Sequence, residues 1–231
     1  MRDDICTIPV SEVFEHNDGC PICRMRDTIE ERMTDYILGD AMMEPDVRIE
    51  TNKTGFCEHH YNNMMSRRGR LQLALMLQTH INEINGEIFK KKLFNTDSKK
   101  TGNAKNITDS CFICSKIEWG LSRMIETVYR CYETQKDFRD MFNSQSMFCL
   151  PHYERLLGGA SKRNMKSYYP EFSENLNRIT GEYSKSLYDD LSKYCTMYDY
   201  RSRDGETDWG NSRDAVERTV AFLNGRIYDV Y

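Results

Sequence analysis

Apolar residues recur at helical spacing along most of the chain. Between Arg24 and Leu38 they fall three or four positions apart, and a longer segment from about Asn62 to Phe94 repeats the pattern. Side chains at this spacing share one face of an α-helix, so each segment predicts a helix with one buried face. The predicted face of the longer helix is made by Leu73, Leu77, Ile81 or His80, Ile84 and Ile88.

The second half of the chain carries the same order of elements. A helix is predicted from Cys111 to about Tyr132, and another from Pro170 to Tyr194. Shorter helices are predicted near the two ends, at Ile8–Phe14 and Ser212–Leu223. In the irregular tract that follows the first long helix, one short strand is predicted from the alternation of Val47, Ile49 and Thr51.

Two helical modules are predicted, with a polar tract between them. Residues 1–94 form the first module and residues 109–199 the second. The tract 95–108, NTDSKKTGNAKNIT, is rich in turn-forming residues, which favours a linker. Residues 200–231 hold a second polar break and the closing helix. The predicted fold is therefore mostly α, built from tandem duplicated helical modules.

Two short cysteine motifs each occur twice in the sequence. A Cys-x-x-Cys motif occurs in DGCPICRMRD and again in DSCFICSKIE, and a Cys-x-x-His motif occurs in FCEHHY and again in FCLPHY. The first motif recurs 91 positions later and the second 92 positions later, so a one-residue slip falls in the loop between them. The candidate metal ligands are Cys20, Cys23, Cys57, His60, Cys111, Cys114, Cys149 and His152.

Each repeat thus offers three thiols and one imidazole, which is a donor set that structural zinc binds as a closed tetrahedron. Both Cys-x-x-Cys pairs stand where helices are predicted to begin, and unpaired backbone N–H groups there stabilise thiolates. We expect two zinc ions, one held by Cys20, Cys23, Cys57 and His60 and one by Cys111, Cys114, Cys149 and His152. The sequence also permits pairs from opposite repeats to share an ion, for instance Cys20 and Cys23 with Cys149 and His152.

Two other chemistries fit the cysteines in part. An iron–sulfur cluster is one alternative, although such clusters prefer four thiolates. A thiol redox site is the other, because a Cys-x-x-Cys pair at a helix start has a lowered thiol pKa. The Cys-x-x-His pairs have no role in a redox site, and no βαβ pattern surrounds the cysteines.

Composition and charge narrow the class of function. The chain has 231 residues, 29% charged and 39% hydrophobic, a balance that suits slim helical units with much polar surface. Its net charge of −4 provides no basic surface for nucleic acid. The start MRDDICTIPV lacks the pattern of a signal peptide, and no apolar segment is long enough to span a bilayer. We expect a cytoplasmic protein that binds neither nucleic acid nor a membrane, and its nine cysteines then favour metal binding over a disulfide framework.

The tract LGDAMMEPDVRIETNKTGFCEHHY resembles a bacterial family defined by a domain of unknown function, number 6062. The opening TIPV, the CPxC motif and a following leucine-rich helix that carries TH are similar to the same family. The resemblance covers the first module closely and the second cysteine module more loosely. It implies a bacterial protein but no established activity.

One part of this tract, Met42–Arg48, has no counterpart in the second repeat, where TQKDFRDMFNSQ stands instead. Glu44, Asp46 and Arg48 are candidates for binding a small ligand or a partner, since an arginine forks onto a carboxylate or phosphate. The alternative is a rigid loop in which Asp46 and Arg48 hold the chain together.

The spacing of residues identifies no nucleophile–base pair, glycine-rich phosphate loop or pair of catalytic acids. The sequence therefore favours a non-enzymatic, zinc-stabilised interaction or adaptor module with an unknown protein partner. A redox or iron–sulfur sensor is one alternative, and a small-molecule binder or enzyme centred on Met42–Arg48 is another. The oligomeric state is left open.

Overall fold

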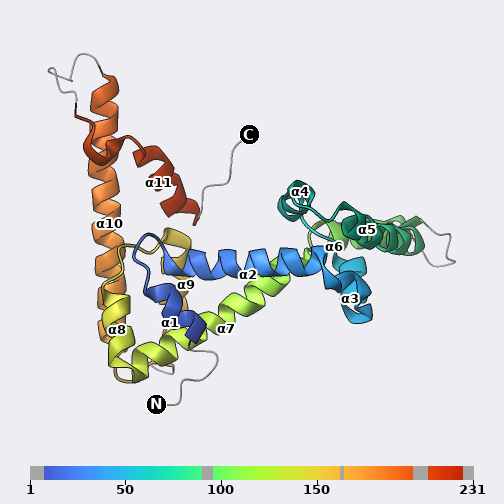
Figure 1. The fold of residues 1–231 in the computed structure, drawn as a ribbon, viewed down its shortest axis with the longest axis horizontal. Helices are drawn as coiled ribbons and strands as arrows, with labels where there is room; N and C mark the ends of the chain where they lie inside the picture. Colours follow the sequence, from blue (N-terminus) through green and yellow to red (C-terminus); the bar gives the residue numbers. More distant parts are fainter. Residues whose placement is uncertain (1–7, 90–95, 162–163, 200–207, 226–231) are drawn as a thin grey trace. The chain divides into compact units, whose positions relative to one another are not determined.

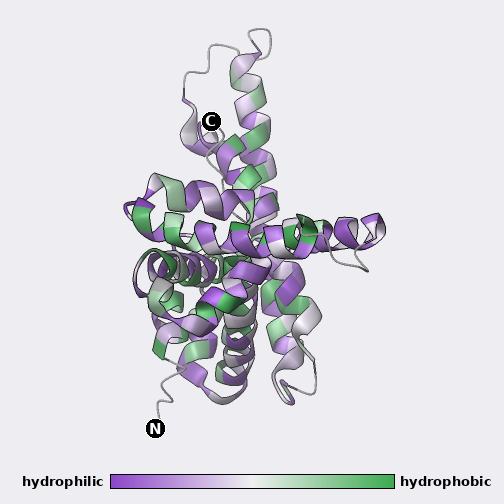
Figure 2. Cartoon of the chain, turned by 90° about the vertical axis from the view of Figure 1, so that its right-hand side faces the viewer, coloured by the Kyte–Doolittle hydropathy of each residue, from purple (hydrophilic) through white to green (hydrophobic). Residues whose placement is uncertain are grey.

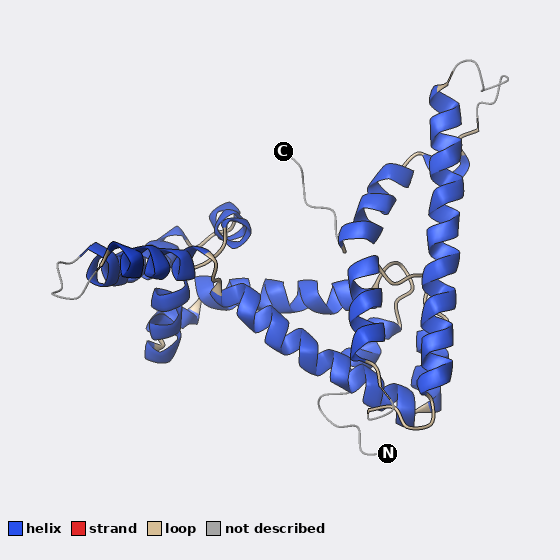
Figure 3. Ribbon diagram, turned by 180° about the vertical axis from the view of Figure 1, so that it is seen from behind, coloured by secondary structure: helices blue, strands red, loops and turns tan. Residues whose placement is uncertain are grey.

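The computed structural model describes residues 8–89, 96–161, 164–199 and 208–225. Every regular element within these ranges is helical, which confirms the predicted mostly α fold (Figure 3). None of these helices combines the length and the apolar character needed to cross a lipid bilayer. The α-helices are α1 (Ile8–Phe14), α2 (Pro21–Leu38), α3 (Pro45–Thr54), α4 (Glu58–Ser66), α5 (Arg70–Ile84), α6 (Asp97–Thr108), α7 (Phe112–Thr134), α8 (Lys136–Asn143), α9 (Leu150–Gly159), α10 (Tyr169–Tyr198) and α11 (Ala215–Asn224) (Figure 1). Short 3-10 turns occupy Asp40–Met43 and Gly210–Ser212, and a π-helical turn occupies Asn85–Phe89.

The chain divides into two compact units. Unit 1 comprises the described parts of Met1–Met25 and Ser122–Tyr231, and unit 2 comprises those of Arg26–Leu121. The chain passes from one unit to the other inside α2 and again inside α7. Unit 2 is thus an insertion in the sequence of unit 1, a division that differs from the predicted modules 1–94 and 109–199.

Aromatic rings form the centre of unit 1. The ring of Phe142 lies 4.9 Å from those of Phe148 and Phe172 and 5.6 Å from that of Phe14, measured between centroids. Tyr132 packs edge-on against Phe142 and Phe172 at 5.1 and 5.0 Å. Such pairs add to the free energy of apolar burial. Because the five rings come from α1, α7, α8, α10 and the segment before α9, the core joins elements that are far apart in the sequence.

The long helix α10 matches the helix predicted at Pro170–Tyr194 and contacts α8, α9 and α11. Its buried side chains include Phe172, Leu176, Ile179 and Leu187, which recur at helical spacing. Figure 2 shows hydrophilic and hydrophobic residues interleaved along the helices, as expected where a helix buries one face and exposes the other.

Unit 2 has a smaller apolar core, to which α2, α4, α5 and the start of α7 contribute. Helix α3 packs along α5. The buried members of this core are Ile37, Leu38, Ala41, Phe56, Met64, Leu73, Met76, Cys111, Phe112, Ile113 and Ile117.

The strand predicted at Val47–Thr51 is wrong, because these residues lie in α3. Pro45 occupies the first turn of this helix, where proline is well tolerated. Thr51 is buried and its hydroxyl donates to the Val47 carbonyl at 2.9 Å, whereas Ile49 is 53% exposed. The three residues therefore follow helical rather than alternating burial.

The helix predicted from Asn62 to Phe94 is broken in two. Helix α4 ends at Ser66, and Gly69 adopts a φ of +118° before α5 begins. In α5 the buried side chains are Leu73, Met76 and His80, while Ile81 is exposed, so His80 belongs to the packing face. Residues 90–94 of the predicted helix lie outside the described residues.

The predicted linker 95–108 contains a helix, α6. The Thr96 hydroxyl caps it by accepting from the Lys99 N–H at 3.4 Å. No side chain of α6 is buried, which explains why its composition resembles that of a loop.

Gly55 precedes Phe56 and Cys57 and has φ +58° and ψ −153°, a conformation that only glycine adopts readily. A Cβ at this position would lie 2.7 Å from Nε2 of the buried His80. We expect Gly55→Ala to lower the free energy of unfolding by about 1 to 3 kcal/mol. Urea denaturation followed by circular dichroism measures this change.

Gly102→Ala is the matched control, because Gly102 lies inside α6 with no heavy atom within 4 Å of an added Cβ. It should leave stability unchanged or raise it by up to about 1 kcal/mol. Equal effects of the two substitutions would contradict the special conformation of Gly55.

Candidate metal centres

The four ligand pairs found in the sequence all stand at helix starts. Cys20 immediately precedes α2, and Cys111 immediately precedes α7, with Cys23 and Cys114 in the first turns. Cys57 and Cys149 are the N-cap residues of α4 and α9, and the histidines follow three positions later. The free backbone N–H groups of a first helical turn create a positive potential that stabilises thiolates.

Hydrogen bonds join the segments that lead into these helices. In unit 1, the Asn17 side chain donates to the Ser144 carbonyl at 2.9 Å and accepts from the Ser146 N–H at 2.8 Å. Gln145 also donates to the Phe14 carbonyl at 2.7 Å. The chain before Cys20 is thereby fixed beside the chain before Cys149.

In unit 2, hydrogen bonds likewise join the two segments that lead into α4 and α7. The Phe112 N–H donates to the Gly55 carbonyl at 3.0 Å, and the Ser110 hydroxyl donates to the Thr54 carbonyl at 2.8 Å. These bonds place the start of α7 beside the start of α4.

Cys20, Cys23, Cys149 and His152 converge in unit 1. His152 Nδ1 lies 3.1 Å from Cys149 Sγ, 3.3 Å from Cys23 Sγ and 3.6 Å from Cys20 Sγ. The Sγ atoms of Cys23 and Cys149 are 3.5 Å apart. Cys23 is half-buried, and the other three side chains are buried.

Cys57, His60, Cys111 and Cys114 converge in unit 2. His60 Nδ1 lies 3.1 Å from Cys57 Sγ, 3.3 Å from Cys111 Sγ and 3.5 Å from Cys114 Sγ. The Sγ atoms of Cys57 and Cys114 are 3.8 Å apart. Cys111 and His60 are buried, Cys57 is half-buried and Cys114 is exposed.

The expected grouping of ligands within each repeat is therefore wrong, and the crossed grouping that the sequence left open is the one observed. Each Cys-x-x-Cys pair lies beside the Cys-x-x-His pair of the other repeat. The physical reason is that α2 and α7 each begin at a Cys-x-x-Cys pair in one unit and end in the other unit. The Cys-x-x-His pair that follows each helix is thus carried into the other unit, where it meets the other repeat.

The thiols of the unit 1 cluster differ strongly in acidity. Burial opposes ionisation of Cys20, but hydrogen bonds with Cys149 and Cys23 and the nearby His152 outweigh it and hold the pKa of Cys20 well below its usual value. The hydrogen bond with Cys20 raises the pKa of Cys149 to about 12. Hydrogen bonds with Cys149 and Cys20, together with burial, raise the pKa of Cys23 far above its usual value.

The thiols of the unit 2 cluster also differ in pKa. The hydrogen bond with Cys114 lowers the pKa of Cys111 to about 3 despite burial, and the same bond raises the pKa of Cys114. Burial disfavours a charged His60, but contacts with Cys111 and Glu30 outweigh burial and raise the pKa of His60 to about 10.

In each cluster one thiolate is favoured, at Cys20 or at Cys111, and the raised pKa values of Cys23, Cys149 and Cys114 reflect the cost of placing further negative charges side by side. A divalent cation removes this conflict, since it attracts every thiolate at once. The eight described cysteines are all free thiols, and the Sγ–Sγ distances of 3.5 and 3.8 Å exceed a disulfide bond. Both clusters are thus suited to holding a metal ion.

Sequence reasoning missed one residue near these clusters, Glu30. Its buried carboxylate lies 2.7 Å from His59 Nε2 and 3.2 Å from His60 Nε2. His59 could have replaced His60 as a ligand on sequence grounds, but it contacts Glu30 instead. The sequence signal is an asymmetry between the repeats, because Leu121 stands 91 positions after Glu30 and Pro151 stands 92 positions after His59.

The three candidate ligand-binding residues of the family tract, Glu44, Asp46 and Arg48, have different surroundings. Arg48 donates to the Leu75 carbonyl at 3.1 Å and to the Thr79 hydroxyl at 2.9 Å, so it ties α3 to α5. Glu44 contacts Tyr36 and raises the pKa of that phenol to about 12, and Asp46 is exposed in the first turn of α3. These contacts support a structural role for Arg48, although Asp46 and Arg48 lie in helix α3 and not in the rigid loop of the alternative interpretation. Ligand binding by the three residues stays a prediction.

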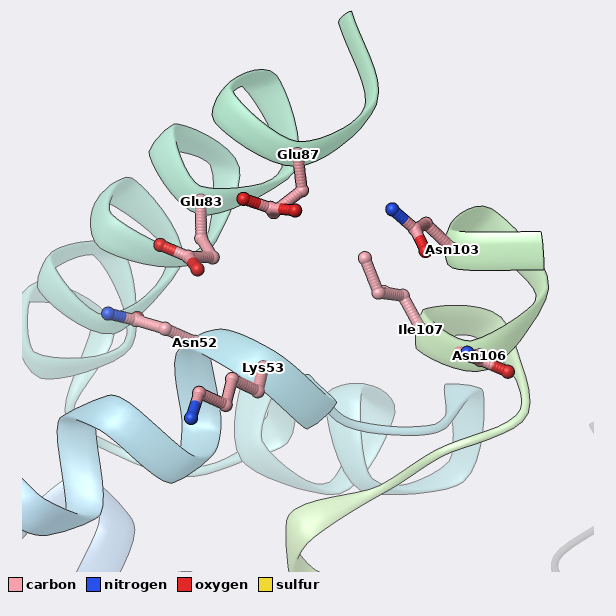
Figure 4. Close-up of a pocket in the computed structure, with 7 residues that line it drawn as sticks. All are labelled: Asn52, Lys53, Glu83, Glu87, Asn103, Asn106 and Ile107. Carbon is pink, nitrogen blue, oxygen red and sulfur yellow. The ribbon is translucent and has the colours of Figure 1, made fainter. Parts of the chain in front are cut away.

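A hollow of about 180 Å³ lies elsewhere in unit 2, between α3, the end of α5 and α6 (Figure 4). Its walls carry two carboxylates, one ammonium group and three amides, which suits hydrogen bonding to polar molecules. The lining residues are Asn52, Lys53, Glu83, Glu87, Asn103, Asn106 and Ile107.

Comparisons with known proteins extend the resemblance seen in the sequence. No curated protein and no solved structure matches the chain. The model of a family of unknown function, DUF6062, matches residues 1–230. Because this match spans essentially the whole chain, the protein belongs to the DUF6062 family.

Proposed function

We propose that the protein is a non-enzymatic helical protein stabilised by two structural zinc ions, and that it acts as an interaction or adaptor module. The observation that carries the proposal is the convergence of three sulfurs and one ring nitrogen in each unit. A tetrahedral zinc with Zn–S bonds of about 2.3 Å and Zn–N bonds of about 2.0 Å separates two sulfurs by about 3.8 Å and a sulfur from the nitrogen by about 3.6 Å. The measured S···S distances are 3.5 and 3.8 Å, and the S···N distances run from 3.1 to 3.6 Å.

The same distances support a single ion over an iron–sulfur cluster. A cluster spreads its ligands around several metal atoms, so ligand sulfurs must stand farther apart than around one ion. Here the four donor atoms of each group lie within 4.8 Å of one another. Four protein donors also complete the coordination of zinc, which is typical of structural rather than catalytic sites. A cytoplasmic location, which is part of the proposal, keeps six thiols reduced.

An exposed apolar stripe on α11 supports an interaction role. Val216, Val220 and Leu223 are exposed and follow one another at intervals of four and three residues, so they share one helix face. Tyr188 on α10 is also exposed. Exposed apolar side chains that gather on one helix face are typical of surfaces that bind another protein.

Metal analysis tests the zinc proposal directly. We expect protein purified without chelators to contain about two zinc ions per chain and to be colourless. Removal of zinc with a strong chelator should reduce the helical circular dichroism signal, because the free energy of metal binding contributes to folding. Brown protein that contains iron and sulfide would support the iron–sulfur alternative, and protein without any metal would overturn the proposal.

Paired substitutions test the crossed grouping of ligands. Cys20→Ser with Cys149→Ser alters one cluster only, so about one zinc per chain should remain. Cys20→Ser with Cys57→Ser alters both clusters, and zinc content should fall close to zero. Cys195→Ser is the control, because Cys195 is exposed and belongs to neither cluster. Grouping within repeats would reverse the outcomes of the two double variants.

A further inference from the structure

A buried carboxylate stands behind one of the two candidate metal centres. Glu30 lies on α2 in unit 2 and is only 4% exposed. Its Oε1 atom lies 3.2 Å from Nε2 of His60, the ring nitrogen that faces away from the three sulfurs. The same oxygen lies 2.7 Å from Nε2 of His59, whose side chain is partly exposed.

His60 needs an acceptor at this position. Its Nδ1 atom faces the three sulfurs, so the proton of a neutral ring resides on Nε2. Nε2 is buried and has no hydrogen-bond partner of good geometry among the described residues, and Glu30 Oε1 at 3.2 Å is near enough to accept after a small turn of either side chain. An acceptor behind a metal-bound histidine fixes the tautomer and the orientation of the ring and makes the ring a stronger donor.

We propose that Glu30 is a positioning residue for the metal centre of unit 2, where it orients His60 as a ligand through Nε2. This inference rests on the proposed function, since it requires that His60 bind a metal ion. Glu30 lies in a group with His59 and His60, and its contact with the cluster of unit 2 is made through the imidazole ring of His60.

The centre of unit 1 has no equivalent support. The residue that matches Glu30 in the second repeat is Leu121, and the residue that matches His59 is Pro151. No ion pair joins His152 to a carboxylate among the residues that the structure describes. The two centres are therefore unequal, and the centre of unit 2 retains its metal against a chelator longer than the centre of unit 1.

Glu30, His59 and His60 also stand close enough to share a cation of their own. In that arrangement His60 would bridge two ions and would have to lose its remaining proton. A neutral ring that donates this proton to Glu30 avoids that cost, which favours the positioning role. The number of bound ions separates the two arrangements.

The test uses the full-length zinc protein and its Glu30→Gln and Glu30→Ala variants. Zinc transfer to a chromophoric chelator should occur in two phases, assigned with Cys149→Ser for unit 1 and Cys114→Ser for unit 2. We expect Glu30→Ala to weaken the affinity of unit 2 about 10- to 100-fold and Glu30→Gln to weaken it less, since an amide oxygen still accepts. The phase of unit 1 should not change.

Two further measurements separate positioning from a general structural effect. The Co²⁺-loaded variants should show an altered ligand-field spectrum at unit 2, because the orientation of the imidazole changes. Glu58→Gln is the control, since it removes an exposed carboxylate two residues from His60 and should leave both phases unchanged. Equal zinc affinity and an equal Co²⁺ spectrum in Glu30→Ala and the wild type would overturn the inference. A third ion that only Glu30 variants lose would also overturn it, and a wild-type protein without metal would overturn the proposed function itself.

Discussion

The meeting of two helix starts around one group of thiols is the constraint on which each unit depends. Every ligand pair is fixed by the backbone at the point where a helix begins, so the donor atoms converge without long, flexible side chains. The buried rings of Phe56 and Phe148 directly precede Cys57 and Cys149 and belong to the packed interiors of their units. Each cluster is therefore continuous with the apolar core of its unit. Disruption of a cluster would disturb the packing of that core, and disruption of the core would disturb the cluster.

Local pattern in the sequence was enough to predict most of the longer helices and the eight residues that cluster. Periodic apolar positions and a repeated two-residue gap between ligands are both properties of short segments. Most predictions that rest on them agree with the structure. The exceptions are instructive. Val47, Ile49 and Thr51 fit either an alternating or a helical pattern, and only the exposure of Ile49 decides between them. Helix α6 buries no side chain, so it has no apolar stripe to reveal it.

The grouping of the ligands could not be derived from the sequence, because it depends on where two long helices carry the chain. Both groupings offer the same donors at the same spacing, and neither violates a local rule. Glu30 was missed for a related reason, since nothing in its immediate sequence links it to His60. The signal in the sequence is a difference between the repeats, because Leu121 stands at the position that matches Glu30.

The insertion of unit 2 within unit 1 has a consequence for how the protein is made. All four candidate ligands of unit 2 have been synthesised once Cys114 has been translated, whereas those of unit 1 are complete only once His152 has been added. At about 5 to 20 residues per second, this delay lasts roughly 2 to 8 s. During that interval Cys20 and Cys23, although they emerged first, remain without their partners. The donor set of the inserted unit 2 is therefore complete before that of unit 1, the reverse of the order in which the two Cys-x-x-Cys pairs are synthesised.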